Sequence, residues 1–197
     1  METYTVIKAD GAAGRDGVPV LSIGRVLGNS DPGIRAWGQL CYTDEDLRVR
    51  LRAEEKDVRA TYTEPVSPVH EDSCLEFFFK REDSPNYFNF EINPNGCLRI
   101  QYGPDRADRV DIVRRDGAEY FGIRTCRTPD GWEASYRIPL GFLRLFHPEH
   151  RFEDGLLANL YKCGDRTAAR HYLCWSPIDT PKPDFHRPEF FGRLLFV

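Results

Sequence analysis

The chain has 197 residues, of which 41% are hydrophobic, 29% charged and 13% aromatic, and its formal net charge is −4. A chain of this length forms one ordinary domain and buries roughly 70% of its unfolded surface. The mixed charge lacks the basic stripe of nucleic-acid-binding proteins, and no run of about 18 apolar residues predicts a membrane-spanning helix. We therefore expect a single domain over residues 1–197, with neither nucleic acid nor membrane as a partner.

The first residues carry neither a basic region nor an apolar region of the secretory-signal type. This pattern predicts a cytoplasmic protein, or a secreted one if the natural chain is longer at its N-terminus. The six cysteines are scattered, and most lie in strand-like runs. Without a C-x-x-C pair they are predicted to be buried thiols that pack as small apolar residues, and no zinc site is expected.

Short apolar runs separated by turn residues recur along the chain, and helical periodicity is nearly absent. Runs rich in Val, Ile, Tyr, Phe, Leu and Cys are typical of β-strands. The predicted strands are residues 4–8, 37–42, 47–53, 74–79, 87–92, 97–102, 120–127, 132–138, 156–163, 171–175 and 190–197. Many short strands at this spacing predict an all-β fold, an antiparallel β-sandwich of the jelly-roll kind with long loops.

Turn residues place the connections between these strands. Asn93-Pro94-Asn95-Gly96 and Pro129-Asp130-Gly131 each predict a hairpin between two neighbouring strands. Residues 139–146 begin with a proline suited to the first position of a helix, so we expect at most one short helix, at this point. Residues 103–116 alternate Arg and Asp and predict an exposed loop, and residues 177–188, with four prolines, predict a long irregular arm.

Residue parity within a strand separates the core from the opposite face, because alternate side chains lie on opposite faces of a sheet. One parity is apolar in three strands: Leu75, Phe77 and Phe79; Phe88, Phe90 and Ile92; and Leu156, Ala158 and Leu160. The other parity carries Asp72 and Glu76, Asn89 and Glu91, and Asn159 and Tyr161. Carboxylates, amides and tyrosines together are typical of a sugar site, and equally of an ordinary solvated sheet face.

Residue parity within a strand also predicts where the tryptophans lie. Trp132 shares its parity with apolar neighbours and is predicted to lie in the core. Trp175 shares parity with Leu173, which favours burial, but Ser176-Pro177 ends the strand at once. A residue at a strand end can lean over the rim of a sheet, so Trp175 is either a core residue or an aromatic platform.

Three segments in this order resemble carbohydrate-binding module family 9. The segment Glu71-Asp72-Ser73-Cys74-Leu75-Glu76-Phe77-Phe78-Phe79 resembles its acidic D-S-x-x-E-x-F strand, and residues 87–96 resemble the strand and turn that follow. Trp175-Ser176-Pro177, followed by residues 183–194, resembles the closing tryptophan and F-G-x-L strand of the family. The resemblance extends from about Trp37 to the end of the chain.

This resemblance implies a β-sandwich that binds sugar without cleaving it, typically at a reducing end held between two tryptophans. On this basis Trp175 matches the second of these tryptophans, and Arg106 or Arg109 supplies a basic contact. Where the first tryptophan is expected the chain reads Pro68-Val69-His70-Glu71, so His70, Tyr62 or Tyr87 takes its place, or the clasp is missing. The predicted ligand-binding residues are Trp175, Asp72, Glu76, Asn89, Glu91, Arg106, Asn159, Tyr161 and His70.

Two other functions remain open on the sequence. Glu76 and Glu91 on neighbouring strands could form the acid and base of a glycoside hydrolase, whose carboxyl groups lie about 5 to 9 Å apart. Alternatively the chain is a structural or partner-binding domain, with the arm of residues 177–188 packed on itself or on another copy.

A bound metal is a further question. Calcium sites are known in the family that the chain resembles, and Asp72, Glu71, Glu91 and Asn93 carry the oxygen ligands that calcium takes. The chain has no D-x-D-x-D-G calcium loop. We therefore expect no cofactor, with calcium as the alternative.

Overall fold

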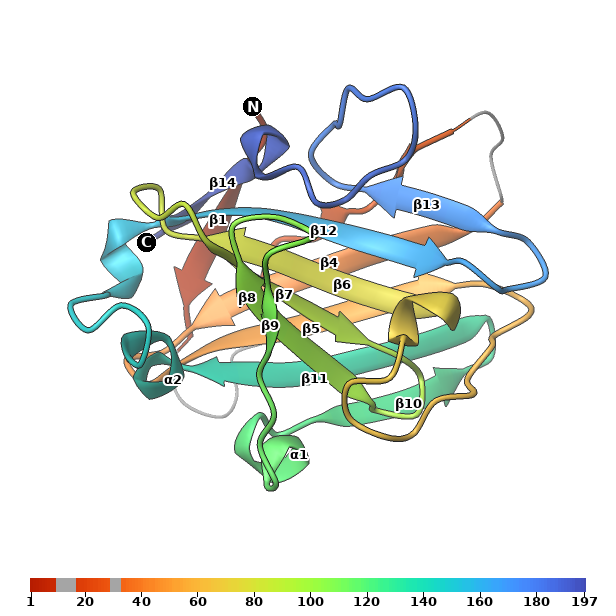
Figure 1. The fold of residues 1–197 in the computed structure, drawn as a ribbon, viewed down its shortest axis with the longest axis horizontal. Helices are drawn as coiled ribbons and strands as arrows, with labels where there is room; N and C mark the ends of the chain where they lie inside the picture. Colours follow the sequence, from red (N-terminus) through yellow and green to blue (C-terminus); the bar gives the residue numbers. More distant parts are fainter. Residues whose placement is uncertain (10–16, 29–32) are drawn as a thin grey trace.

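The computed structural model describes residues 1–9, 17–28 and 33–197 (Figure 1). Its strands are β1 (Thr3–Lys8), β2 (Leu21–Ser22), β3 (Arg25–Val26), β4 (Arg35–Tyr42), β5 (Asp46–Glu54), β6 (Cys74–Lys80), β7 (Tyr87–Ile92), β8 (Leu98–Gly103), β9 (Val110–Asp111), β10 (Arg124–Thr128), β11 (Gly131–Pro139), β12 (Leu156–Gly164), β13 (His171–Cys174) and β14 (Gly192–Phe196). The helices are α1 (Gly117–Tyr120) and α2 (Leu140–Arg144), with 3-10 turns at Val69–Glu71, Phe152–Asp154 and Pro188–Phe190. Within the described residues, no helix is long and apolar enough to cross a membrane.

The strands form a curled sheet with two layers, which confirms the predicted all-β, sandwich-like fold. One layer contains β10, β11, β5 and β4, and the other contains β14, β12, β6, β7, β8 and β9. β1 joins the two layers, because its first part pairs with β14 and its last two residues, Ile7 and Lys8, pair with β4. Both of these pairings are parallel, so the sheet is mixed and not wholly antiparallel as predicted.

The core lies between the layers, where parity predicted it. All nine apolar residues predicted for the inner faces of β6, β7 and β12 are buried, and so is Trp132 on β11. Opposite them β5 and β11 pair along nine residues and bury Leu47, Val49, Leu51 and Ala53 from β5. Phe90 stacks on Tyr136 of β11 with its ring centroid 6.0 Å away. The alternation of apolar and polar residues therefore positions both layers correctly.

The structure departs from the sequence prediction at two element boundaries. The predicted strand over residues 120–127 begins only at Arg124, because α1 and the turn at Gly122, with φ of 58°, precede it. Residues 139–146 contain the predicted helix, α2, and α1 is a second one, so the described residues hold two short α-helices where at most one was predicted. The predicted strand over residues 190–197 begins at Gly192, because Pro188 starts a 3-10 turn before it.

A buried ion pair connects the layers at one end of the core. Lys162, on the inward face of β12, is 0% exposed, and its ammonium lies 3.2 Å from Glu55 Oε1, just after β5. Lys162 Nζ also donates to the Cys163 carbonyl at 2.9 Å and to His171 Nε2 at 2.7 Å. Glu55 accepts in turn from the Trp132 indole at 2.8 Å. Every donor of the ammonium is therefore used, which is what makes a buried lysine tolerable.

We expect Lys162→Met to lower the free energy of unfolding by about 3 to 5 kcal/mol, because it leaves Glu55 buried without its cation. Lys80→Met, at the half-buried end of β6, should change it by about 0.5 kcal/mol or less. Urea unfolding of both variants measures the difference. The double variant Lys162→Met/Glu55→Gln should regain stability relative to Lys162→Met, and additive losses would contradict the coupling.

Candidate functional site

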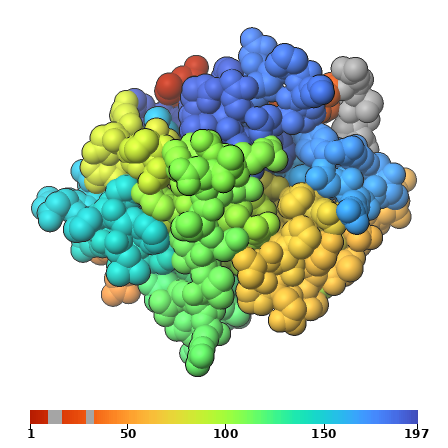
Figure 2. Space-filling model, viewed as in Figure 1, coloured from red at the N-terminus to blue at the C-terminus, as the bar shows by residue number. Residues whose placement is uncertain are grey.

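The outer face of β12, β6 and β7 is covered and not solvated. Its apolar members pack in a second buried cluster with the C-terminal arm and the turn before β6: Val69, Cys74, Phe78, Tyr87, Cys97, Tyr161, Cys163, Cys174, Ile178, Phe185 and Phe191. Figure 1 shows the arm leaving β13 and looping back to β14. In Figure 2 the arm, in dark blue, meets the green segment after β8 over this face. Polar side chains on the face are therefore shielded from bulk water.

Two aromatic contacts hold the arm on the sheet. The Phe185 ring stacks on Tyr161, with centroids 4.1 Å apart and planes inclined by 9°. Tyr161 Oη also donates to the Phe185 carbonyl at 3.1 Å. The next residue, His186, packs on Phe78 at 5.1 Å and lies 2.7 Å from Tyr87 Oη through its Nδ1. The predicted irregular arm thus has a fixed position over the sheet.

A narrow pocket of about 90 Å³ remains between the sheet, the arm and the loop after β8. Its walls are formed by His70, Glu76, Glu91, Arg106, Arg109, Cys163, Asp165, Tyr172, Pro183, Phe185 and His186. These residues come from five separate parts of the chain. We refer to this cavity below as the carboxylate pocket, because two buried carboxyl groups form part of its wall.

Glu76 and Glu91 are direct cross-strand partners on β6 and β7. They are 2% and 4% exposed. Burial, reinforced by the neighbouring Glu91 carboxylate, raises the pKa of Glu76 well above its ordinary 4.5. Asn89 Nδ2 donates to Glu91 Oε1 at 2.7 Å, whereas Glu91 Oε2 has no hydrogen-bond partner in the part of the chain that the structure describes.

The basic wall of the pocket comes from the loop after β8. Arg109 Nη1 lies 2.9 Å from the ring nitrogens of His186, and Arg106 forms an ion pair of 2.7 Å with Asp184 of the arm. Burial, followed by the charges of Arg109 and Arg106, lowers the pKa of His186 to about 2. His186 is therefore neutral, and the two guanidinium groups carry the positive charge of the pocket.

The remaining wall is a hydrogen-bonded group next to β13. Tyr172 Oη donates to Asp165 Oδ1 and accepts from Arg170 Nε at 2.7 Å. The Asp165 amide donates to the His70 carbonyl at 3.1 Å, and the Cys163 thiol donates to the same oxygen at 3.3 Å. These bonds fix the turn before β6 against the end of β12.

The structure brings together four of the predicted ligand-binding residues in the carboxylate pocket: His70, Glu76, Glu91 and Arg106. Arg109, the alternative to Arg106, lines it as well. Asn89 lies behind the pocket and bonds to Glu91. The direct ligand contacts of all these residues stay predictions, and the geometry places them at one site.

Three other predicted residues lie outside the pocket and hold the surrounding chain. Asp72 Oδ2 accepts from the amides of Thr61 and Tyr62 at 2.8 and 3.0 Å. Asn159 exchanges two hydrogen bonds of 2.9 Å with the backbone of Ser176, and Tyr161 supports Phe185 as described above. These contacts give each of the three a role in positioning the arm or the segment before β6.

Trp175 is 8% exposed and belongs to the core cluster between the layers. Its ring lies against Gly192, where a Cβ atom would come within 2.7 Å of Trp175 Cη2. Its amide donates to the Leu160 carbonyl at 3.0 Å. Trp175 does not line the carboxylate pocket, so its role as a ligand contact stays a prediction, while its packing role is evident.

The acidic residues considered for calcium do not form a site together. Asp72 Oδ2 is surrounded by N–H donors, including Asn93 Nδ2 at 2.9 Å, which is the environment of a hydrogen-bonded carboxylate and not of a metal ligand. No group of three or more His, Cys, Asp and Glu side chains among the described residues is arranged to hold a metal ion.

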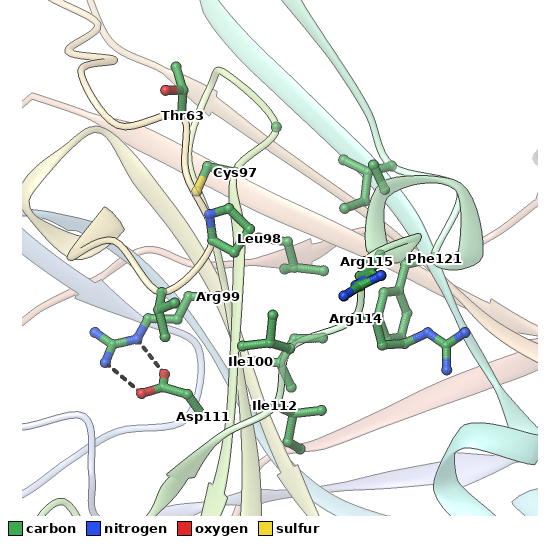
Figure 3. Close-up of a pocket in the computed structure, with 17 residues that line it drawn as sticks. Thr63, Cys97, Leu98, Arg99, Ile100, Asp111, Ile112, Arg114, Arg115 and Phe121 are labelled. Atoms are coloured by element: carbon green, nitrogen blue, oxygen red, sulfur yellow. Dashed lines mark hydrogen bonds and ion pairs between the residues drawn. The ribbon is translucent and has the colours of Figure 1, made fainter.

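A larger cavity of about 190 Å³ lies between β8, β9 and α1 (Figure 3). Leu98, Ile100, Ile112 and Phe121 form much of its wall, and an ion pair of 2.8 Å between Arg99 and Asp111 closes one side. None of the ligand-binding residues predicted from the sequence lines it. Its wall also includes Arg99, Asp111, Arg114 and Arg115, but its centre is formed by apolar side chains.

Sequence reasoning missed six residues of the carboxylate pocket: Cys163, Asp165, Tyr172, Pro183, Phe185 and His186. Strand parity could have indicated Cys163, which lies two residues after Tyr161 on the same face of β12. Phe185 and His186 lie in the proline-rich arm, where no periodicity tells which way a side chain points. Only the position of the arm over the sheet assigns them to the pocket.

Comparison with known proteins defines the family. A family model described as carbohydrate-binding family 9 matches residues 32–196 of the chain. The chain belongs to carbohydrate-binding family 9. The family that the three sequence segments resemble is therefore confirmed. A search of curated protein sequences gives no match.

Solved structures share the fold of this family 9 chain. A provisionally named carbohydrate-binding protein from Bacteroides uniformis superposes with a TM-score of 0.82 at 25% identity, covering 100% of this chain and 99% of the other. A family 9 module from Caldicellulosiruptor kristjanssonii, solved with glucose, gives a TM-score of 0.66 at 14% identity over 100% and 96% of the two chains. The same organism's module solved with cellotriose gives 0.65 at 13% identity over 99% and 93%.

For Trp175→Ala we expect a loss of about 3 to 5 kcal/mol in the free energy of unfolding, because the change leaves a cavity beside Gly192. Trp175→Phe, which fills part of that space, should lose less. Thermal unfolding followed by circular dichroism measures both. Loss of sugar binding by Trp175→Phe at an unchanged midpoint would instead establish Trp175 as a ligand contact.

The free energy of unfolding should decrease as the pH is lowered, and His186 is one cause. Its pKa is about 2 in the folded chain and ordinarily 6.5, so below pH 6.5 the unfolded chain binds a proton that the folded chain does not. His186→Gln should therefore reduce the dependence of the unfolding free energy on pH between 6 and 4 by about 1.4 kcal/mol per pH unit. Urea unfolding at each pH tests this, with Tyr87→Phe as the control that retains the titrating ring. An unchanged pH dependence in His186→Gln would show that His186 is protonated in the folded state.

Proposed function

We propose that this family 9 protein binds carbohydrate without cleaving it, and that the carboxylate pocket receives the hydroxyl groups of the sugar. The observation that carries the proposal is Glu91 Oε2, a buried carboxylate oxygen without a hydrogen-bond partner among the described residues. Leaving such an acceptor unpaired costs about 1 to 3 kcal/mol or more. A sugar hydroxyl supplies the donor that this oxygen requires.

The other walls of the pocket suit the remaining groups of a sugar. Arg109 offers N–H donors for hydroxyl and ring oxygens, and Glu76, whose pKa is raised by burial, offers carboxyl oxygens that accept from hydroxyl groups. The rings of Tyr172 and Phe185 provide apolar surface next to these polar groups. Donors, acceptors and aromatic surface in one cavity are the combination that sugar recognition requires.

The size of the pocket limits what enters it. A cavity of about 90 Å³ holds more than one water molecule, whose share of liquid volume is about 30 Å³, and less than a whole disaccharide. We infer that the end of a saccharide chain enters, and a reducing end fits this restriction. With a few hydrogen bonds of roughly 1 kcal/mol each, the affinity should lie in the micromolar to millimolar range.

The comparisons support the proposal at the level of ligand class. The related module from Caldicellulosiruptor kristjanssonii was solved with glucose and with cellotriose. We extend this to the present chain as binding of a mono- or oligosaccharide. The calorimetric titration in the next paragraph, and not the related module, determines which sugar this chain binds.

Glu91→Gln should weaken sugar binding at least about tenfold, because an amide presents an N–H where the sugar hydroxyl needs an acceptor. Its thermal midpoint should stay the same or rise, since an unpartnered buried carboxylate is removed. Calorimetric titration with glucose, cellobiose and cellotriose measures the affinities. Glu149→Gln, an exposed position, is the matched control and should bind like the wild type.

The same samples test the hydrolase alternative, for which the facing carboxyl groups of Glu76 and Glu91 are the specific observation. Incubation with a panel of glycosides should release no reducing sugar. Release that Glu76→Gln abolishes would make the chain a glycoside hydrolase.

Equal sugar affinity of the wild type and of Glu91→Gln in the titration would rule out the carboxylate pocket as the binding site.

A further inference from the structure

A second cavity adjoins the carboxylate pocket. It measures about 420 Å³ and is lined by Leu27, Gly28, Arg170, His171, Tyr172, Lys182 and Pro183. Tyr172 and Pro183 line both cavities, so the two lie on either side of these residues. A saccharide with one end in the carboxylate pocket would have to pass over the rim formed by Tyr172 and Pro183 to reach the second cavity.

The volume of the second cavity is that of a small-molecule site. Ligand sites of about 300 to 1,000 Å³ are typical of drug-sized molecules, and the cavity of about 420 Å³ falls in this range. The carboxylate pocket, at about 90 Å³, does not. A saccharide with its first unit at the narrow pocket would therefore have room for a whole unit here.

The wall that the two cavities share is rigid. The hydroxyl of Tyr172 is bonded to both Asp165 and Arg170. The Arg170 guanidinium lies 5.5 Å from the centroid of the Tyr172 ring. On the other side of β13, His171 Nδ1 bonds to the Ala169 carbonyl at 2.5 Å, and His171 Nε2 accepts from the buried Lys162. The ring and the backbone beside it are thus held before a ligand arrives.

The charge of the second cavity differs from that of the first. Arg170 and Lys182 line it, and among the described residues no carboxylate does. The Arg170 side chain is 68% exposed and forms one ion pair, at 3.4 Å, with Asp165. Lys182 is exposed and forms no ion pair within the described residues. Burial and the charge of Lys162 keep the pKa of His171 at about 4, so this ring adds no charge at neutral pH.

We propose that this second cavity is a subsite for an anionic sugar unit, in which Lys182 and Arg170 bind the carboxylate of a uronic acid or an equivalent charged group. The proposal rests on the proposed function, since the carboxylate pocket holds the adjoining unit. Two cations, with no carboxylate among the described residues of the lining, favour an anion over a neutral hydroxymethyl group. The ligand class is therefore an oligosaccharide that carries an acidic unit next to its terminal unit.

The experiment compares cellobiose with disaccharides of glucose and glucuronic acid joined through the same linkage in either order, by calorimetric titration at low salt. One order should bind about three- to tenfold more tightly than cellobiose, and added salt should reduce the difference because the contact is exposed. A disaccharide sulfated on one unit shows whether the carboxylate or the charge alone is recognised. Either result supports the anionic subsite.

Lys182→Glu should abolish the preference for the acidic disaccharide over cellobiose. Arg170→Gln should reduce the preference as a second variant. Lys56→Glu, at an exposed lysine after β5, is the matched control and should retain it. Equal binding of acidic and neutral disaccharides by the wild type would overturn the subsite while the proposed function stands. Binding of neither would overturn both.

Discussion

The packing of the C-terminal arm on the outer face of β12, β6 and β7 is the constraint on which the site depends. Stacking of Phe185 on Tyr161 at 4.1 Å and the tilted contact of His186 with Phe78 at 5.1 Å enclose polar side chains that an open sheet would leave in water. The enclosure raises the pKa of Glu76 and lowers that of His186. Without the arm the same residues would form an ordinary solvated face.

Lys162 and Glu91 are both buried, but they differ in how many of their hydrogen-bonding atoms have a partner. Lys162 faces the core and uses its ammonium donors on Glu55, His171 and the Cys163 carbonyl. Glu91 faces the opposite side of the same layer and leaves one oxygen without a partner among the described residues. Buried polar groups that serve only the fold are normally fully bonded. Asp72 Oδ1 and both ring nitrogens of His150 are also without a hydrogen bond among the described residues. Of these groups only Glu91 lines the carboxylate pocket, which is the physical reason to assign it a ligand.

In this fold the acidic and the basic residues of the site lie on different kinds of element. Structures with 13% to 25% identity to this chain retain the same arrangement of layers, because a sandwich tolerates exchange of apolar residues that preserves volume and alternation. Glu76 and Glu91 lie on strands, whereas Asp165, Arg106, Arg109 and Lys182 lie on the connecting segments. Loops vary more readily than the strands that hold them, so the acidic end of the site is tied to the fold and its basic end can change.

The sequence by itself determined the layers and the faces. Alternation in β6, β7 and β12 assigned all nine apolar inward residues correctly, because the period of a strand is local and needs no partner to be read. The family segments determined the architecture, and the same parity placed Glu76 and Glu91 together. Only the tertiary structure decided that their face is enclosed, that Trp175 packs against Gly192, and that His186 and Tyr172 complete the pocket. His186 reaches Tyr87, 99 positions away, through an arm without periodicity, and no local pattern specifies where such an arm will lie.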